Sequence, residues 1–124
     1  MSDNTPEMQA LVDALASDQS QTLHNMAEHH VLVFRWLLEG YEITVFDGVG
    51  YSLARSHNLA DIINEIEGVE EAEIFAHKHG DDKTYAWALI TPYGVAHDET
   101  VADHSTEPWM CRMMCEIGNS YYED

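Results

Sequence analysis

The densest run of charge in this chain consists of six carboxylates within thirteen residues. They are Asp61, Glu65, Glu67, Glu70, Glu71 and Glu73. Asp61 and Glu65 are one turn apart on a predicted helix, where neighbouring side chains lie ~5–6 Å from each other. The phosphates along one DNA strand have a similar spacing, because each strand carries one charge per ~3.4 Å of rise and also winds around the axis. We therefore predict that these residues bind a basic partner in place of phosphates; an ordinary solvated helix face is the alternative interpretation.

The whole chain is strongly acidic. Its 124 residues include 23 Asp and Glu but only five Lys and Arg, which gives a formal net charge of −18. Such a surface repels phosphates, so we expect no direct binding to nucleic acid and none to an anionic membrane. A basic partner, a cation or a role in solubility remains. We predict a basic protein or a nucleoprotein complex as the partner.

The chain also has eight histidines, a high count for its length. Four of them fall on two predicted strands and the following loops, where they could approach one another: His77, His79, His97 and His104. Zinc bound by such a set with a carboxylate is chemically sensible, but no zinc-binding spacing of His or Cys accompanies it. We expect these imidazoles to compensate the acidic charge, and we expect no metal and no cofactor. His29 and His30 are interpreted as a polar stripe on a helix.

Other patterns that resemble catalytic motifs lack the context that the chemistry needs. A second acidic set comprises Asp98, Glu99, Asp103 and Glu107. Paired carboxylates can serve as general acid and base, but charges on an edge strand also keep sheets from aggregating. The glycine-containing segment 47–54 lies in a predicted hairpin, so it matches neither a dinucleotide-binding turn nor a nucleophile elbow. We expect no catalytic residues and no enzymatic activity.

Cysteine content and the N-terminal sequence favour the cytoplasm. Cys111 and Cys115 stand four apart in a predicted helix, which is unfavourable for a disulfide, so we interpret them as reduced thiols. The first four residues are polar and acidic, unlike a signal peptide. The longest apolar run is far shorter than the ~18–20 residues of a membrane span.

Hydrophobic periodicity predicts a single α+β domain over residues 1–124. A pair of helices occupies residues 5–40, and a ββαβββα portion occupies residues 41–118. The expected architecture is an antiparallel sheet of four to five strands with helices packed on one face, in the order α-α-β-β-α-β-β-β-α. The predicted elements are helices from residue 5 to about 15 and from 18 to 39, strands at 41–46, 50–55, 72–76, 85–90 and 95–101, a helix at 58–66 capped by Asn58, and a helix from about 106 to 117.

The most apolar stretch, residues 31–38, has more hydrophobic surface than one helix face requires. One face continues the stripe of the predicted second helix. The other face consists of Leu32, Val33, Trp36 and Leu37. A helix that is apolar all round is buried all round. This helix therefore either runs through the core or packs one face on a second copy, and the second option makes the chain a homodimer that self-associates through these four residues.

Several segments resemble small accessory proteins of tailed bacteriophages. They are Tyr-Glu-Ile-Thr-Val-Phe-Asp-Gly at 41–48, Ala-Arg-Ser at 54–56, the capped helix at 58–66, Tyr-Ala-Trp-Ala-Leu-Ile at 85–90 and Val-Ala-Asp-His-Ser at 101–105. These segments cover about half of the chain, and the resemblance implies strand pairing and carries no catalytic residue.

In size and charge the chain is also similar to phage-encoded inhibitors that mimic DNA, of the anti-CRISPR or anti-restriction type. This resemblance implies a non-enzymatic inhibitor that binds the basic nucleic-acid-binding surface of a host defence or nucleic-acid-processing protein. A hydrophobic interaction or oligomerisation module, acidic only for solubility, is the alternative that the apolar stretch 31–38 supports.

Overall fold

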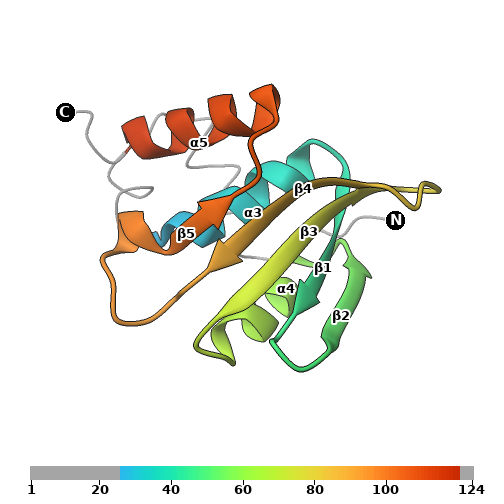
Figure 1. Cartoon of the computed structure of the whole chain (residues 1–124), viewed down its shortest axis with the longest axis horizontal. Coiled ribbons are helices and arrows are strands. Elements are labelled where there is room, and N and C mark those ends of the chain that lie inside the picture. The colour runs from blue at the N-terminus through green and yellow to red at the C-terminus, as the bar shows by residue number, and fades with distance from the viewer. Residues whose placement is uncertain (1–25, 121–124) are drawn as a thin grey trace.

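Three helices and a five-stranded antiparallel sheet form the computed structural model, which describes residues 26–120 (Figure 1). The predicted α+β fold is confirmed. The elements are α3 (Glu28–Leu38), β1 (Tyr41–Phe46), β2 (Tyr51–Ser56), α4 (Leu59–Glu67), β3 (Ala72–Lys78), β4 (Thr84–Ile90), a 3-10 turn η1 (His97–Glu99), β5 (Val101–His104) and α5 (Pro108–Ser120).

The strands are arranged in the order β2-β1-β3-β4-β5. The strand β1 pairs with both β2 and β3, so these two flank it and run parallel to each other. The helix α4 joins them by passing over β1, so the sheet is not one continuous meander, and only β3, β4 and β5 are neighbours in chain order beyond the β1–β2 hairpin. This crossover brings the end of α4 and the start of β3 to the end of the sheet where the β1–β2 turn also lies.

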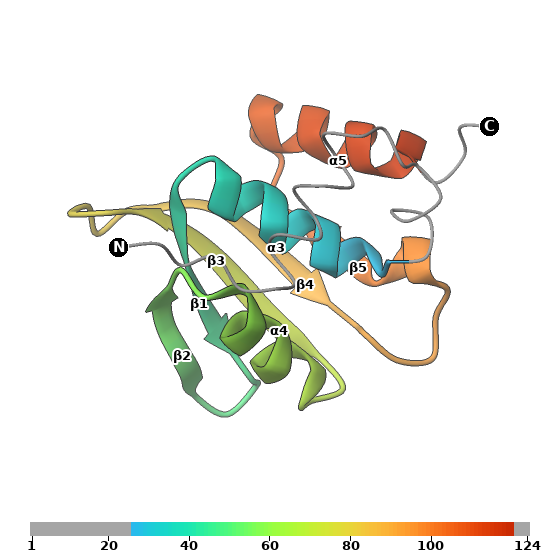
Figure 2. The same cartoon turned by 180° about the vertical axis from the view of Figure 1, so that it is seen from behind.

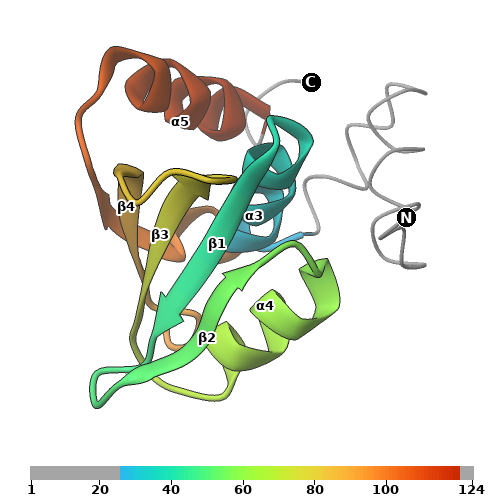
Figure 3. The ribbon, with the colours of Figure 1, turned by 90° about the vertical axis from the view of Figure 1, so that its right-hand side faces the viewer.

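Helices α3 and α4 cover one face of the sheet, as Figures 2 and 3 show, and α5 packs against α3. Every second side chain of a strand points toward the helices. In this sheet the side chains at these positions are small or β-branched. The fully buried strand residues are Ile43, Val45, Ala72, Ile74, Ala76, Ala86, Ala88 and Ile90. None of the three helices lies on the other face, which we call the open face (Figure 1).

Helix α4 begins and ends as predicted. The side chain of Asn58 accepts a hydrogen bond from the backbone N–H of Asp61 at 3.0 Å, and Gly68 follows the last helical residue. The buried stripe is Leu59, Ile62, Ile63 and Ile66. A side-chain cap satisfies a backbone donor that the helix itself leaves without a partner.

We expect Asn58→Ala to lower the free energy of unfolding by about 1 kcal/mol, the usual cost of losing an N-cap. Urea denaturation followed by circular dichroism measures this loss. Asn64→Ala is the matched control, because Asn64 is exposed in the middle of the same helix and alanine is the better helix former there. Equal destabilisation by the two substitutions would contradict the capping role.

Helix α3 differs from the predicted second helix at its beginning. Met26 and Ala27 are not helical, and Ala27 is extended, with φ −66° and ψ 146°, so the predicted continuous helix over 18–39 is wrong at this point. The chain turns here because the first helical residues bind the segment before β5. The backbone N–H of His29 donates to Thr100 Oγ1 at 3.0 Å, and the carboxylate of Glu28 accepts from the backbone N–H of Val101.

The predicted strand at 95–101 is also wrong in its position. Residues 97–99 form η1, and β5 starts only at Val101. The backbone N–H of Thr91 donates to the carbonyl of Thr100 at 2.8 Å, which closes the loop after β4 and delays strand pairing. The predicted helix from residue 5 and the tail at 121–124 lie outside the described residues.

Candidate functional site

All five Lys and Arg residues lie at one end of the sheet, where β1 begins and β3 ends. They are Arg35, Arg55, Lys78, Lys83 and Arg112. Tyr41, the first residue of β1, pairs with Lys78, the last residue of β3. Arg55 donates to the carbonyl of Lys78 at 2.7 Å, and Arg35 and Arg112 line a pocket that includes Tyr41. We call this end of the sheet the basic end.

An aromatic cluster holds the two lysines of the basic end. The Nζ atoms of Lys78 and Lys83 lie 4.7 and 5.4 Å from the centre of the Tyr85 ring. The Tyr85 hydroxyl donates to Asp81 at 2.6 Å, and Tyr41 lies beside Tyr85. Cations over aromatic faces are held in place electrostatically, so the positive charge of the protein is fixed at this end.

An acidic groove of about 550 Å³ lies at the opposite end of the sheet. It is formed by the end of β1, the α4–β3 connection, the start of β3, the end of β4 and the loop that follows. Its carboxylates are Asp47, Glu70, Glu71 and Glu73, and its large apolar side chains are Phe46, Val69, Leu89 and Tyr93. No Lys or Arg lines the groove, so its negative charge is not neutralised locally.

The floor of the groove combines a carboxylate with apolar side chains on the open face. In the sheet register Glu73 stands between Phe46 of β1 and Leu89 of β4, so the three side chains form a row across three strands. The indole Nε1–H of Trp87 donates to Glu73 at 2.9 Å. This hydrogen bond holds the Glu73 carboxylate in place between two hydrophobic neighbours.

Asp47 forms the rim of the groove at the β1–β2 turn. Its carboxylate accepts hydrogen bonds from the backbone N–H groups of Gly50 and Val49, each at 2.9 Å. These two bonds lower the pKa of Asp47, with the bond from Gly50 making the larger contribution. Gly48 has φ +94°, which explains why glycine occupies this turn. The rim is therefore ionised at neutral pH and fixed in position.

A groove of this composition suits the side chain of Arg or Lys. Such a side chain has an apolar stem that packs along hydrophobic surface and a cationic head that needs a carboxylate. Hydrogen bonds between ionised partners are roughly twice as strong as neutral ones. Chemically, the arrangement can bind a basic segment or basic surface.

The six carboxylates of the predicted row do not all line the same groove. Glu70, Glu71 and Glu73 line the groove, whereas Asp61 and Glu65 lie on α4 outside it. Glu67, the last residue of α4, turns toward two histidines. Three of the six predicted residues are thus among the four carboxylates of the groove. The run along the sequence did not include Asp47 or the apolar side chains of the floor that come from β1 and β4.

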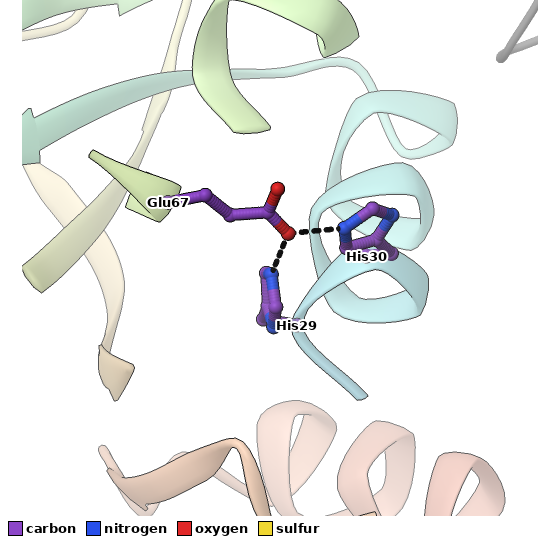
Figure 4. A group of neighbouring side chains, drawn as sticks. All are labelled: His29, His30 and Glu67. Atoms are coloured by element: carbon purple, nitrogen blue, oxygen red, sulfur yellow. Dashed lines mark hydrogen bonds and ion pairs between the residues drawn. The ribbon is translucent and has the colours of Figure 1, made fainter. Parts of the chain in front are cut away.

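His29, His30 and Glu67 form a separate cluster (Figure 4). The Nε2 atoms of His29 and His30 lie 3.0 and 2.7 Å from the same oxygen of Glu67, Oε2. His29 is 1% exposed. The two imidazole rings meet edge to face, with their centres 4.6 Å apart. The cluster joins the first turn of α3 to the last residue of α4.

Burial and these contacts shift the pKa values of the cluster. Burial lowers the pKa of His29 to about 4, against the opposing effect of its hydrogen bond to Glu67, so this imidazole is neutral at physiological pH. Burial alone would raise the pKa of Glu67, but the hydrogen bonds from His30 and His29 outweigh it and the net pKa is lowered. Next to them, burial raises the pKa of Glu28 to about 7.

The histidines that the sequence grouped as zinc candidates lie apart. His77 contacts Thr44 at 3.0 Å, and His79 contacts Glu42 at 2.9 Å. The Nδ1 atom of His104 contacts the carbonyl of Ser105. Within residues 26–120, the only group of three potential metal ligands is His29, His30 and Glu67. The sequence pattern predicted that His29 and His30 form a polar stripe on a helix, and this prediction is wrong for His29, which is 1% exposed. The apolar run 31–38 that follows directly on the same helix was the signal that could have indicated its burial.

The predicted self-association residues are mostly inside the domain. Leu32, Val33 and Trp36 are fully buried and Leu37 is half-buried. Among the described apolar residues of α3, only Leu38 is largely exposed. The helix that is apolar all round is thus surrounded by its own chain, as the core alternative required, and these side chains do not form an external surface.

No protein-family model, curated protein or solved structure matches this chain. Within residues 26–120, no helix is both long and apolar enough to cross a membrane. The function proposed below therefore follows from the residues and their geometry.

Proposed function

We propose that this chain is a non-enzymatic binding protein whose acidic groove binds a basic surface of another protein. The observation that carries this proposal is the groove itself, with Asp47, Glu70, Glu71 and Glu73 around an apolar floor at the end of the sheet that has no Lys or Arg. The partner's Arg and Lys side chains would occupy the groove and pair with these carboxylates.

The partner class that fits best is a protein that itself binds nucleic acid. Such proteins have clustered Arg and Lys side chains arranged to meet phosphates, and a chain with net charge −18 is attracted to them over a long range. We propose that the chain acts as a phage-type inhibitor, of the anti-CRISPR or anti-restriction type, in the host cytoplasm. It would bind a host defence or nucleic-acid-processing protein in place of DNA or RNA.

Separation of charge along the sheet gives this binding a direction. The basic end carries every Lys and Arg, and these cations offset the carboxylates there, so a basic partner is attracted more strongly at the groove, which no Lys or Arg lines. Complementary potentials of this kind steer encounter and fix the orientation of the complex. A uniformly acidic coat that served only solubility would need neither this asymmetry nor a hydrogen bond that fixes Glu73 on the groove floor.

A capture experiment from host lysate tests the proposal. The wild-type chain, a Glu70→Lys/Glu71→Lys variant and a Glu39→Lys/Asp82→Lys control are immobilised and exposed to lysate at about 50 mM and about 500 mM salt. The control makes the same charge change at exposed positions near the basic end. We expect basic nucleic-acid-binding proteins to be captured at low salt by the wild type and by the control, and to be lost with the groove variant.

Raising the salt to about 500 mM should release these proteins, because counterions compete with the carboxylates. An excess of nucleic acid should release them as well, since it occupies the same basic surface. Equal capture by the groove variant, or capture that salt leaves unchanged, would contradict the proposed electrostatic binding.

A further inference from the structure

We propose that His29, His30 and Glu67 form a binding site for a divalent transition-metal ion, with zinc as the best fit. This site goes beyond the proposed function and does not depend on it. Three ligand atoms of the types that zinc prefers, two imidazole nitrogens and one carboxylate oxygen, lie within 4.8 Å of one another.

The ligand atoms are close enough to surround one ion after an adjustment of the side chains. Both Nε2 atoms contact Glu67 Oε2, at 3.0 and 2.7 Å (Figure 4). In a tetrahedral zinc site with bonds of about 2.0–2.1 Å, ligand atoms are about 3.3 Å apart. The two N–O separations therefore open by a few tenths of an ångström when metal bonds replace the hydrogen bonds, and the partly exposed side chains of His30 and Glu67 rotate to bring all three atoms, now within 4.8 Å of one another, around the ion.

The chain already orients the ligands from behind. Nδ1 of His29 lies 3.1 Å from Thr100 Oγ1, and both residues are 1% exposed. A hydroxyl can donate or accept, so it can accept a hydrogen bond from the N–H of Nδ1 when Nε2 binds metal. Metal-binding histidines almost always have such a partner on the second nitrogen, which fixes the tautomer and the ring.

Glu67 is held in place by its backbone as well. Its carbonyl accepts a hydrogen bond from the hydroxyl of Tyr93, a residue of the loop after β4. The three ligands therefore come from the first turn of α3 and the end of α4, and two residues of the segment between β4 and β5 support them. Ligands whose orientation is already fixed by hydrogen bonds lose less conformational entropy when a metal binds.

The site is buried on one side and open on the other. His29 is enclosed, whereas the side chains of His30 and Glu67 are about one third exposed, at 33% and 37%. An ion can thus enter from solvent and keep a water molecule as its fourth ligand. Two imidazoles select zinc and similar ions over Mg²⁺ and Ca²⁺, which prefer oxygen ligands.

Calorimetric titration of the chelator-treated, metal-free protein with zinc tests this site. We expect one zinc ion per chain, bound with a dissociation constant of about 10 μM or lower, and no comparable binding of Mg²⁺. The variants His30→Gln and Glu67→Gln, which alter the two partly exposed ligands, should each weaken zinc binding by about tenfold to 100-fold.

Two variants serve as matched controls. His57→Gln replaces an exposed histidine that pairs with a different carboxylate, and Glu65→Gln replaces a glutamate on the same helix as Glu67. Both should bind zinc as the wild type does, and circular dichroism should show that all four variants are folded. Absence of zinc binding by the wild type would overturn the proposal, and so would equal affinities in the His30→Gln or Glu67→Gln variants or equal binding of Mg²⁺.

Discussion

Trp36→Ala is expected to lower the free energy of unfolding by about 3–5 kcal/mol, the usual cost of truncating a fully buried aromatic side chain. Trp36 is 0% exposed and packs in the same cluster as Leu32 and Phe34 of its own helix and Ile43 of β1. Alanine leaves a cavity that these neighbours fill only in part. Urea denaturation of the wild type and the variant measures the loss.

Leu38→Ala is the control, because Leu38 belongs to the same helix but is 55% exposed. We expect this substitution to change the free energy of unfolding by no more than about 0.5 kcal/mol. The midpoint of the wild-type transition should also be independent of protein concentration. If Trp36→Ala left stability unchanged and instead shifted the molecular mass from dimer to monomer, the buried position of this helix would be contradicted.

The substitution Trp36→Phe examines the effect of the buried indole N–H. Trp36 Nε1 is the only buried side-chain nitrogen or oxygen in residues 26–120 that has no hydrogen-bond partner. A buried unpaired donor costs about 1–3 kcal/mol. Trp36→Phe removes this donor along with part of the ring, so the two effects oppose each other and the net loss of stability should be much smaller than with alanine.

Local sequence patterns were sufficient to predict most of the elements. The stripe of Leu59, Ile62 and Ile66, with Asn58 before it and Gly68 after it, determines α4 without any tertiary information. The alternation of apolar and polar residues likewise predicted β1, β3 and β4 without any tertiary information. The start of α3 could not be predicted in this way, because it depends on Thr100, a partner 71 residues away.

Strand order and the two sites depend on contacts between distant segments. Nothing local to β3 indicates that it pairs with β1 rather than with β2. The acidic groove needs Phe46 and Leu89 beside Glu73, and only the sheet register supplies them. Glu67 belonged to the dense carboxylate run by position, yet its contacts are with histidines 37 and 38 residues earlier. The density of charge along the sequence predicted an acidic surface, whereas the carboxylates that share one groove are determined by the sheet register and the chain connections.

Glu42 connects the charge distribution to the pH dependence of stability. It is only 5% exposed, and its carboxylate accepts from Arg55 Nε at 2.7 Å and contacts His79 Nδ1 at 2.9 Å, with His57 at 3.2 Å. The hydrogen bond from His79, together with that from Arg55 and against the opposing effect of burial, lowers the pKa of Glu42 to about 2. The carboxylate therefore binds a proton less readily in the folded state than in the unfolded state.

Since the folded pKa of Glu42 lies below its ordinary value of 4.5, its ion pairs stabilise the protein above about pH 4.5. This contribution is lost as the pH falls from 4.5 through 2. Its three partners remain partly in water, which screens the interaction, so we expect a contribution of about 1–2 kcal/mol. Glu42→Gln should be less stable than the wild type by this amount at about pH 5 to 6, and the difference should shrink as the pH falls toward the folded pKa of about 2 and vanish below it.

Urea denaturation at several pH values between about 2 and 6 measures that difference. Glu39→Gln is the matched control, because Glu39 is an exposed glutamate only three residues away at the same end of the sheet. Its effect on the free energy of unfolding should be close to zero throughout. A constant difference between Glu42→Gln and the wild type at every pH would show that Glu42 acts through packing alone. A difference confined to the higher pH values would show instead that its charge holds the edge strand β2, through Arg55, to the centre of the sheet.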